Sequence, residues 1–170
     1  KAFGITSVAI GNSSRALNTN AVAMGNTANA GAASAIAIGQ NANYQVEIKE
    51  NGVVTTQAGY KTTGATSIAI GANTNASATS ANAICNAATA SGQDSTAIGT
   101  KAQATQQSAI AFGSDALADK TNAIAIGGQS KAQGATTVAL GTKAEATAGN
   151  ATALGASTLA NENAVAVGVS

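Results

Sequence analysis

The sequence predicts an all-β fold, a single-chain parallel β-roll or solenoid built from coils of fourteen residues. The first observation is a motif, apolar-Ala-apolar-Gly, that recurs fourteen residues apart, as in Ile110-Ala111-Phe112-Gly113 and Ile124-Ala125-Ile126-Gly127. The second is an alternation of small and large residues around each motif, which is typical of strands. The third is a composition of mostly Ala, Gly, Asn, Ser and Thr, without Pro, Trp or His. A fixed period of this kind indicates stacked coils, each of which buries its apolar face only against its neighbours.

We number the positions of each coil as slots, counted from the second apolar residue of its motif, which is slot 0. The copy around Ile84 is irregular, because Asn82 and Cys85 replace the first apolar residue and the glycine. Val167 ends a last coil that is one residue short. The members of slot 0 before this last coil are Ile10, Met24, Ile38, Ile70, Ile84, Ile98, Phe112, Ile126, Leu140 and Leu154.

Each coil is predicted to contain two strands. The first reads small-apolar-Ala-apolar, as in Ser67-Ile68-Ala69-Ile70. A turn follows at the slot +1 glycine, because glycine adopts a positive φ at the lowest cost. The second strand carries alanine at slot +6 and a small residue at slot +4, as at Ala104 and Ala102. We expect about five residues in each strand.

The predicted interior of the coil is narrow. Fourteen residues at about 3.3 Å each give a perimeter of about 46 Å, and two five-residue strands leave little for the connecting turns. The two sheets must therefore lie closer than the usual spacing of about 10 Å. Only alanine and serine side chains fit between them, so we expect the alanines to point inward.

The large apolar residues at slots −2 and 0 must then point outward from the first strand. Stacked over the coils, they form an aliphatic surface larger than a soluble monomer normally exposes. The simplest way to cover it is a symmetric homo-oligomer, whose number of subunits the residues do not determine. The predicted interface residues are Val8, Ile10, Val22, Met24, Ile36, Ile38, Ile68, Ile70, Ile98, Ile110, Phe112, Ile124, Ile126, Val138, Leu140 and Leu154.

The outer face of the second strand, at slots +3 and +5, is predicted to face solvent because it is polar. Stacking places Lys101 one coil, about 4.8 Å, from Asp115, and Lys131 one coil from Glu145. Opposite charges are therefore expected one coil apart on this face.

An insertion of eighteen residues, 44–61, interrupts the period between Ile38 and Ile70. Asn51-Gly52 with alternating residues on both sides predicts a β-hairpin. The hairpin could brace a neighbouring subunit or serve as a recognition loop, since insertions in repeat proteins are often functional. The candidate ligand-binding residues are Tyr44, Glu47, Lys49, Glu50, Asn51, Tyr60 and Lys61.

The recurring pattern, with Ser7-Val8-Ala9-Ile10-Gly11 and Ala16 as one copy and Asn122-Ala123-Ile124-Ala125-Ile126-Gly127 and Ala132 as another, resembles the YadA-like head domain of trimeric autotransporter adhesins of Gram-negative bacteria. The resemblance spans residues 1–170 apart from the hairpin. It implies a left-handed β-roll, a homotrimer, and an adhesive head at the bacterial cell surface that binds a host matrix or cell-surface protein. It also implies that this segment belongs to a longer protein, whose C-terminal region anchors it in the outer membrane.

Other function classes find little support in the residues. We expect no catalytic site, because the chain lacks His and its carboxylates are scattered. We expect no metal or cofactor, no nucleic-acid partner since there is no basic stripe, and no membrane contact by this segment. An ice-binding surface would need regular threonine files, which the outward slots lack. A passive spacer in a surface fibre remains the alternative to an adhesive head.

Overall fold

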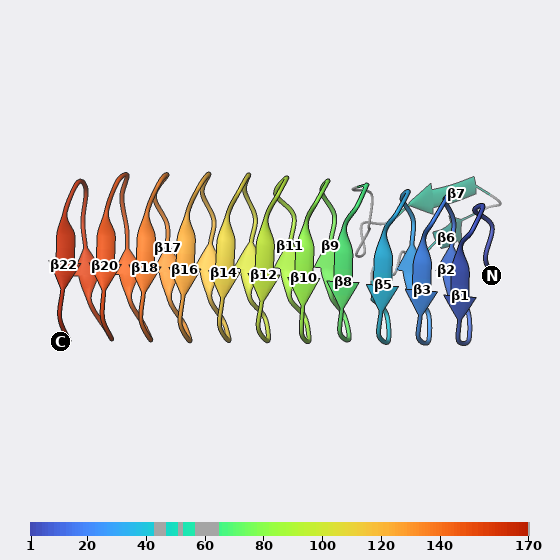
Figure 1. Cartoon of the computed structure of the whole chain (residues 1–170), viewed down its shortest axis with the longest axis horizontal. Helices are drawn as coiled ribbons and strands as arrows, with labels where there is room; N and C mark the ends of the chain where they lie inside the picture. Colours follow the sequence, from blue (N-terminus) through green and yellow to red (C-terminus); the bar gives the residue numbers. More distant parts are fainter. Residues whose placement is uncertain (43–46, 51–52, 57–64, 170) are drawn as a thin grey trace.

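The computed structural model describes residues 1–42, 47–50, 53–56 and 65–169, and it shows a parallel β-solenoid (Figure 1). The coils stack in a single row, with the N-terminus at one end and the C-terminus near the other. An eleven-stranded parallel sheet runs along this row in the order β1-β3-β5-β8-β10-β12-β14-β16-β18-β20-β22. The second strands form a two-stranded sheet, β2-β4, and a seven-stranded sheet that runs from β9 to β21.

The strands of the first sheet have three residues each: β1 (Val8–Ile10), β3 (Val22–Met24), β5 (Ile36–Ile38), β8 (Ile68–Ile70), β10 (Asn82–Ile84), β12 (Thr96–Ile98), β14 (Ile110–Phe112), β16 (Ile124–Ile126), β18 (Val138–Leu140), β20 (Thr152–Leu154) and β22 (Val165–Val167). The second strands have two residues each: β2 (Arg15–Ala16), β4 (Asn29–Ala30), β9 (Asn75–Ala76), β11 (Thr89–Ala90), β13 (Gln103–Ala104), β15 (Leu117–Ala118), β17 (Lys131–Ala132), β19 (Glu145–Ala146) and β21 (Leu159–Ala160). The expectation of five-residue strands was therefore wrong.

The strands are short because each coil has two turns with a left-handed residue. Slot +3 adopts φ near 55°, as at Asp115 (φ 55), and slot −4 does the same, as at Asn122 (φ 57). A residue in this conformation cannot continue a strand. Backbone hydrogen bonds between coils nevertheless continue through the turns, since the Asp115 N–H donates to the Thr100 carbonyl at 2.9 Å.

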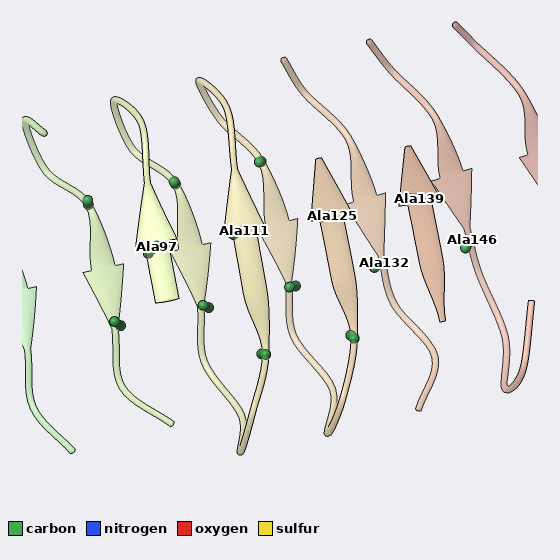
Figure 2. Packing of buried hydrophobic residues seen from close by; sticks show 14 of the residues in the cluster. Ala97, Ala111, Ala125, Ala132, Ala139 and Ala146 are labelled. Atoms are coloured by element: carbon green, nitrogen blue, oxygen red, sulfur yellow. The ribbon is translucent and has the colours of Figure 1, made fainter. Parts of the chain in front are cut away.

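Alanine fills the interior, as predicted. Every buried apolar residue in the described part of the chain is an alanine. Figure 2 shows Ala97, Ala111, Ala125 and Ala139 of the first sheet with Ala132 and Ala146 of the second. The pairing register repeats the period, because Ala111 lies beside Ala125 and Ala125 beside Ala139.

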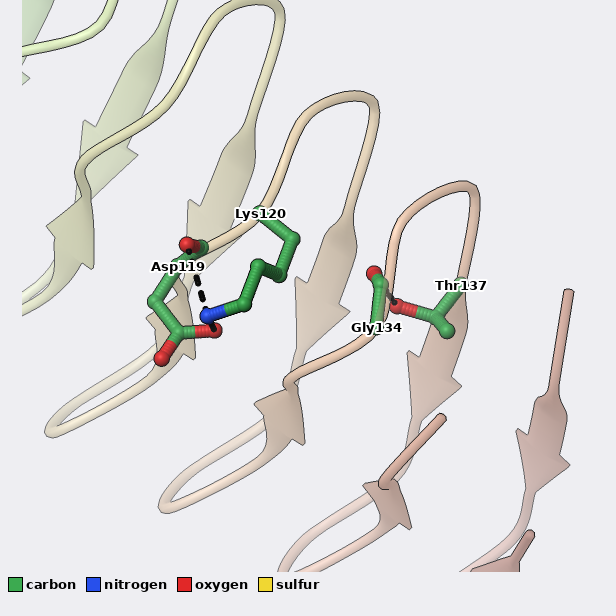
Figure 3. A network of polar contacts seen from close by, with 4 residues as sticks. All are labelled: Asp119, Lys120, Gly134 and Thr137. Carbon is green, nitrogen blue, oxygen red and sulfur yellow. Dashed lines mark hydrogen bonds and ion pairs between the residues drawn. The ribbon is translucent and has the colours of Figure 1, made fainter. Parts of the chain in front are cut away.

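Threonine also enters the interior, although only alanine and serine were expected there. Thr74 and Thr137 are fully buried. Each donates a hydrogen bond to a turn glycine three residues earlier, with Thr137 Oγ1 at 2.7 Å from the Gly134 carbonyl oxygen (Figure 3) and Thr74 Oγ1 at 3.0 Å from that of Gly71. The larger side chain is tolerated beside a turn, where a backbone acceptor satisfies its hydroxyl.

The slot +1 glycines are needed for two reasons. Gly127 has φ +130°, and a Cβ built there would lie 2.4 Å from the backbone oxygen of Gly141 in the next coil. Cys85 occupies the same slot with φ 92 and an exposed side chain. The preceding strand, β10, still pairs with β8 and β12 in the common register, so the irregular copy preserves the stacking.

The solenoid continues directly across the insertion. β5 pairs with β8, which places Ala37 beside Ala69, and the Ile36 N–H donates to the Ser67 carbonyl at 2.9 Å. The interrupted period therefore resumes in the same register, as the sequence predicts.

Replacing Ala125 by leucine should disrupt the interior, because the alanine is fully buried between two sheets. We expect a loss of about 1–3 kcal/mol in unfolding free energy, the usual cost of an overpacked core. Chemical denaturation at equal protein concentration measures this loss. Gln103→Leu, which places the same side chain at an exposed position of β13, is the control and should be nearly neutral. Equal stabilities of the two variants would show that the alanines do not define the interior.

Candidate functional site: the aliphatic wall and the insertion

The outward-facing side chains at slots −2 and 0 of the eleven-stranded sheet form a continuous surface, which we call the aliphatic wall. Side chains alternate between the two faces of a strand, so these two slots lie opposite the buried slot −1 alanine. Ile10 and Phe112 are each more than half exposed, at 55% and 51%. All sixteen predicted interface residues lie in first-sheet strands, and none is buried. Their role as an interface between subunits remains a prediction.

The wall also contains residues that the sequence prediction left out. Ile84 occupies slot 0 of the irregular copy, and Val165 and Val167 of β22 are each 71% exposed. The fourteen-residue count alone would have identified Ile84. Three positions of slot −2 are polar, namely Asn82, Thr96 and Thr152.

On the opposite side of the solenoid, one of the two pairs of neighbouring opposite charges forms an ion pair. Lys131 of β17 and Glu145 of β19 lie one coil apart as predicted, with Nζ 2.7 Å from Oε1. Lys101 and Asp115 form no ion pair in the described structure. Both are left-handed turn residues rather than strand residues, and Asp115 instead accepts a hydrogen bond from Ser114 Oγ at 3.1 Å.

A second kind of charged contact lies in the turns that follow the second strands. Lys120 forms an ion pair with its neighbour Asp119, with Nζ 3.3 Å from Oδ1 (Figure 3). Both side chains are partly exposed, so solvent screening makes such a pair worth little to stability. The charges on this side vary from coil to coil and do not form a single-sign surface.

The insertion contains two strands that pair with each other. β6 (Glu47–Glu50) and β7 (Val53–Thr56) are antiparallel, with Glu50 opposite Val53 and Glu47 opposite Thr56. Glu47, Lys49 and Glu50 of the candidate ligand residues belong to β6. The remaining candidates, Tyr44, Asn51, Tyr60 and Lys61, lie outside the described residues, as do the turn residue Gly52 and the ends of the predicted 44–61 segment.

The described part of the chain holds neither a metal-binding group of side chains nor a helix that could span a membrane. No three side chains of His, Cys, Asp or Glu gather there in a group that could hold a metal ion. Among these residues there is also no helix with the length and apolar character needed to span a membrane. The extended surfaces of the solenoid are therefore the candidate functional features.

One comparison with known proteins identifies a related family. The model of the YadA head domain repeat, which covers two copies of the repeat, matches residues 2–26, 16–42, 90–116, 118–144 and 132–158. Together these matches span more than half of the chain. No curated protein sequence matches it.

Ile126→Asp should prevent assembly through the aliphatic wall, because the carboxylate would be buried without a partner. We expect sedimentation velocity to show loss of the oligomer at micromolar concentration. Gln103→Asp places the same charge on the exposed face of β13 and should leave the sedimentation coefficient unchanged. An oligomer that tolerates Ile126→Asp as well as Gln103→Asp would exclude the wall as its interface.

Proposed function

This chain belongs to the family of YadA head domains, and we propose that it is the adhesive head of a trimeric surface fibre that attaches a bacterium to host cells or extracellular matrix. The family consists of heads of trimeric autotransporter adhesins displayed by Gram-negative bacteria, and it is non-enzymatic. The proposal is supported by the match of these repeats to the YadA head family, together with a solenoid whose first sheet presents the aliphatic wall.

Assembly is the first part of the proposal. Each large side chain of the wall would contribute about 1.5–3 kcal/mol on full burial. A wall of this length exceeds the few hundred Å² of contiguous apolar surface found on typical monomers. In three copies packed around one axis, each wall would be covered by the walls of the other two copies, consistent with the family's trimeric organisation. The anchor of such a fibre in the outer membrane would lie outside this segment.

Recognition is the second part. With the walls covered, the second sheet, the turns and the insertion would stay accessible to a host protein. The turns and outer slots combine uncharged polar groups with isolated charges, as at Asp115 and Lys143 beside the Lys131–Glu145 pair. The insertion differs from every other coil and could either contact the ligand or brace a neighbouring subunit. A passive spacer, the alternative function, would require only the regular coils.

The test compares the wild-type chain with a variant in which a two-residue Gly-Ser link replaces residues 44–61. Both are assayed for binding to immobilised matrix proteins and to intact host cells. We expect saturable binding by the wild-type trimer. If it binds neither the matrix proteins nor the host cells, the passive-spacer function would be favoured. Thermal and chemical denaturation of the two proteins are measured in parallel.

The stability measurement distinguishes the two roles of the insertion. If it braces a neighbour through aliphatic residues such as Ile48 or Val54, deletion should lower the unfolding free energy by more than about 2 kcal/mol. If it only recognises a ligand, binding should be lost while stability is retained, because shortening a loop has a small effect. We expect the first outcome, a fall of more than about 2 kcal/mol in the unfolding free energy on deletion. Unchanged stability together with unchanged binding would contradict both roles.

A further inference from the structure

The repeat that builds the aliphatic wall also makes its alignment ambiguous. Neighbouring coils carry similar residues at the same slots, since Ile110, Ile124 and Val138 follow one another in one file. If one subunit slid along another by one coil, about 4.8 Å, most aliphatic side chains would meet equivalent partners. The aliphatic contacts alone would therefore distinguish poorly between the aligned and the displaced arrangements. Something else must define the axial alignment of subunits.

The uniform pattern is broken near the middle of the chain. Asn82 and Thr96 lie side by side at slot −2 of β10 and β12, between Ile68 and Ile110 of the same file. Both are half-buried already in the single chain. Asn82 is the only carboxamide in slots −2 and 0 of the eleven first-sheet strands, all of which the structure describes.

Much of the hydrogen-bonding capacity of these two side chains is unused within the described chain. Asn82 Nδ2 donates to the Ser80 carbonyl at 3.2 Å. No hydrogen bond from another described residue reaches Asn82 Oδ1, and none engages the Thr96 hydroxyl. Buried at an interface without partners, such groups would cost free energy. A carboxamide both donates and accepts, so identical Asn82 residues brought together around a symmetry axis can satisfy one another.

We propose that Asn82 and Thr96 form a polar layer that sets the axial register between copies of this chain. The inference rests on the proposed assembly through the aliphatic wall. In the aligned arrangement Asn82 meets Asn82 of the other copies. If one copy slips by one coil in one direction, its Asn82 meets Ile68 of another copy. If it slips in the other direction, its Thr96 meets Ile110. A polar side chain then faces an apolar one in both cases. A single buried asparagine selects the register of coiled coils by the same physics.

Fluorine NMR can detect the register directly. Phe112 lies on the wall, and Phe3 is the only other phenylalanine in the chain. With 4-fluorophenylalanine at both positions, a symmetric aligned trimer gives a single Phe112 resonance, because the three sites are equivalent. A slipped trimer gives several. Phe3→Leu assigns the Phe112 signal, and sedimentation of each sample establishes the oligomeric state.

The test variant is Asn82→Ile/Thr96→Ile, which continues the aliphatic file. We expect it to remain trimeric, with a thermal midpoint at or above that of the wild type, and to show several Phe112 resonances. Thr152→Ile is the matched control, an added isoleucine at slot −2 of β20, and should keep the single resonance of the wild type. A trimeric double variant with one resonance would overturn the proposed layer, as would several resonances in the wild type or in Thr152→Ile. Loss of the trimer in the double variant would also overturn it, whereas a monomeric wild type would instead refute the proposed assembly.

Discussion

The narrow space between the two sheets of each coil is the constraint on which the rest of the structure depends. The short perimeter of a fourteen-residue coil keeps its two sheets closer than the usual spacing of about 10 Å, so larger side chains are not admitted. Backbone hydrogen bonds between the described coils, in the strands and in the turns, repeat this narrow cross-section along the stack. The buried slots therefore hold Ala, Ser or Thr. The hydroxyl of Thr137 donates to a turn carbonyl, whereas those of Ser67 and Ser95 have no hydrogen-bond partner among the described residues. Since every large apolar side chain is excluded from this space, the fold places its hydrophobic surface outside. The size limit inside the coil therefore explains why the outer face of the first sheet is aliphatic.

The turns show how closely the coils approach one another. At Gly113, as at Gly127, an added Cβ would come within about 2.5 Å of the next coil's backbone. The residue that begins the second turn varies with the buried residue three positions later. Gly92 stands before Ser95 and Gly134 before Thr137, both of which are buried. Lys120 stands before the buried Ala123. In these coils, glycine three residues before the buried position accompanies a hydroxyl at the interior edge, whereas lysine at the same place accompanies alanine.

Much of the fold could be predicted from the sequence, because the period alone aligns the residues that stack. The inward alanines, the outward Ile and Val residues and the continuation of the sheet from β5 to β8 all follow from counting fourteen. Strand length could not be predicted in this way. The left-handed turn residue at slot +3 is Lys101, Asp115 or Ala87 in different coils, so no residue type marks it. The roles of the wall and the insertion depend on other chains, and a single sequence contains only one side of such contacts.

If the aliphatic wall makes folding depend on association between chains, unfolding should depend on protein concentration. For a chain that folds only in a complex, the thermal midpoint rises with protein concentration by mass action. We expect the thermal midpoint to fall over a hundredfold dilution, with no folded monomer in sedimentation at micromolar concentration. A folded monomer whose midpoint is independent of concentration would contradict it.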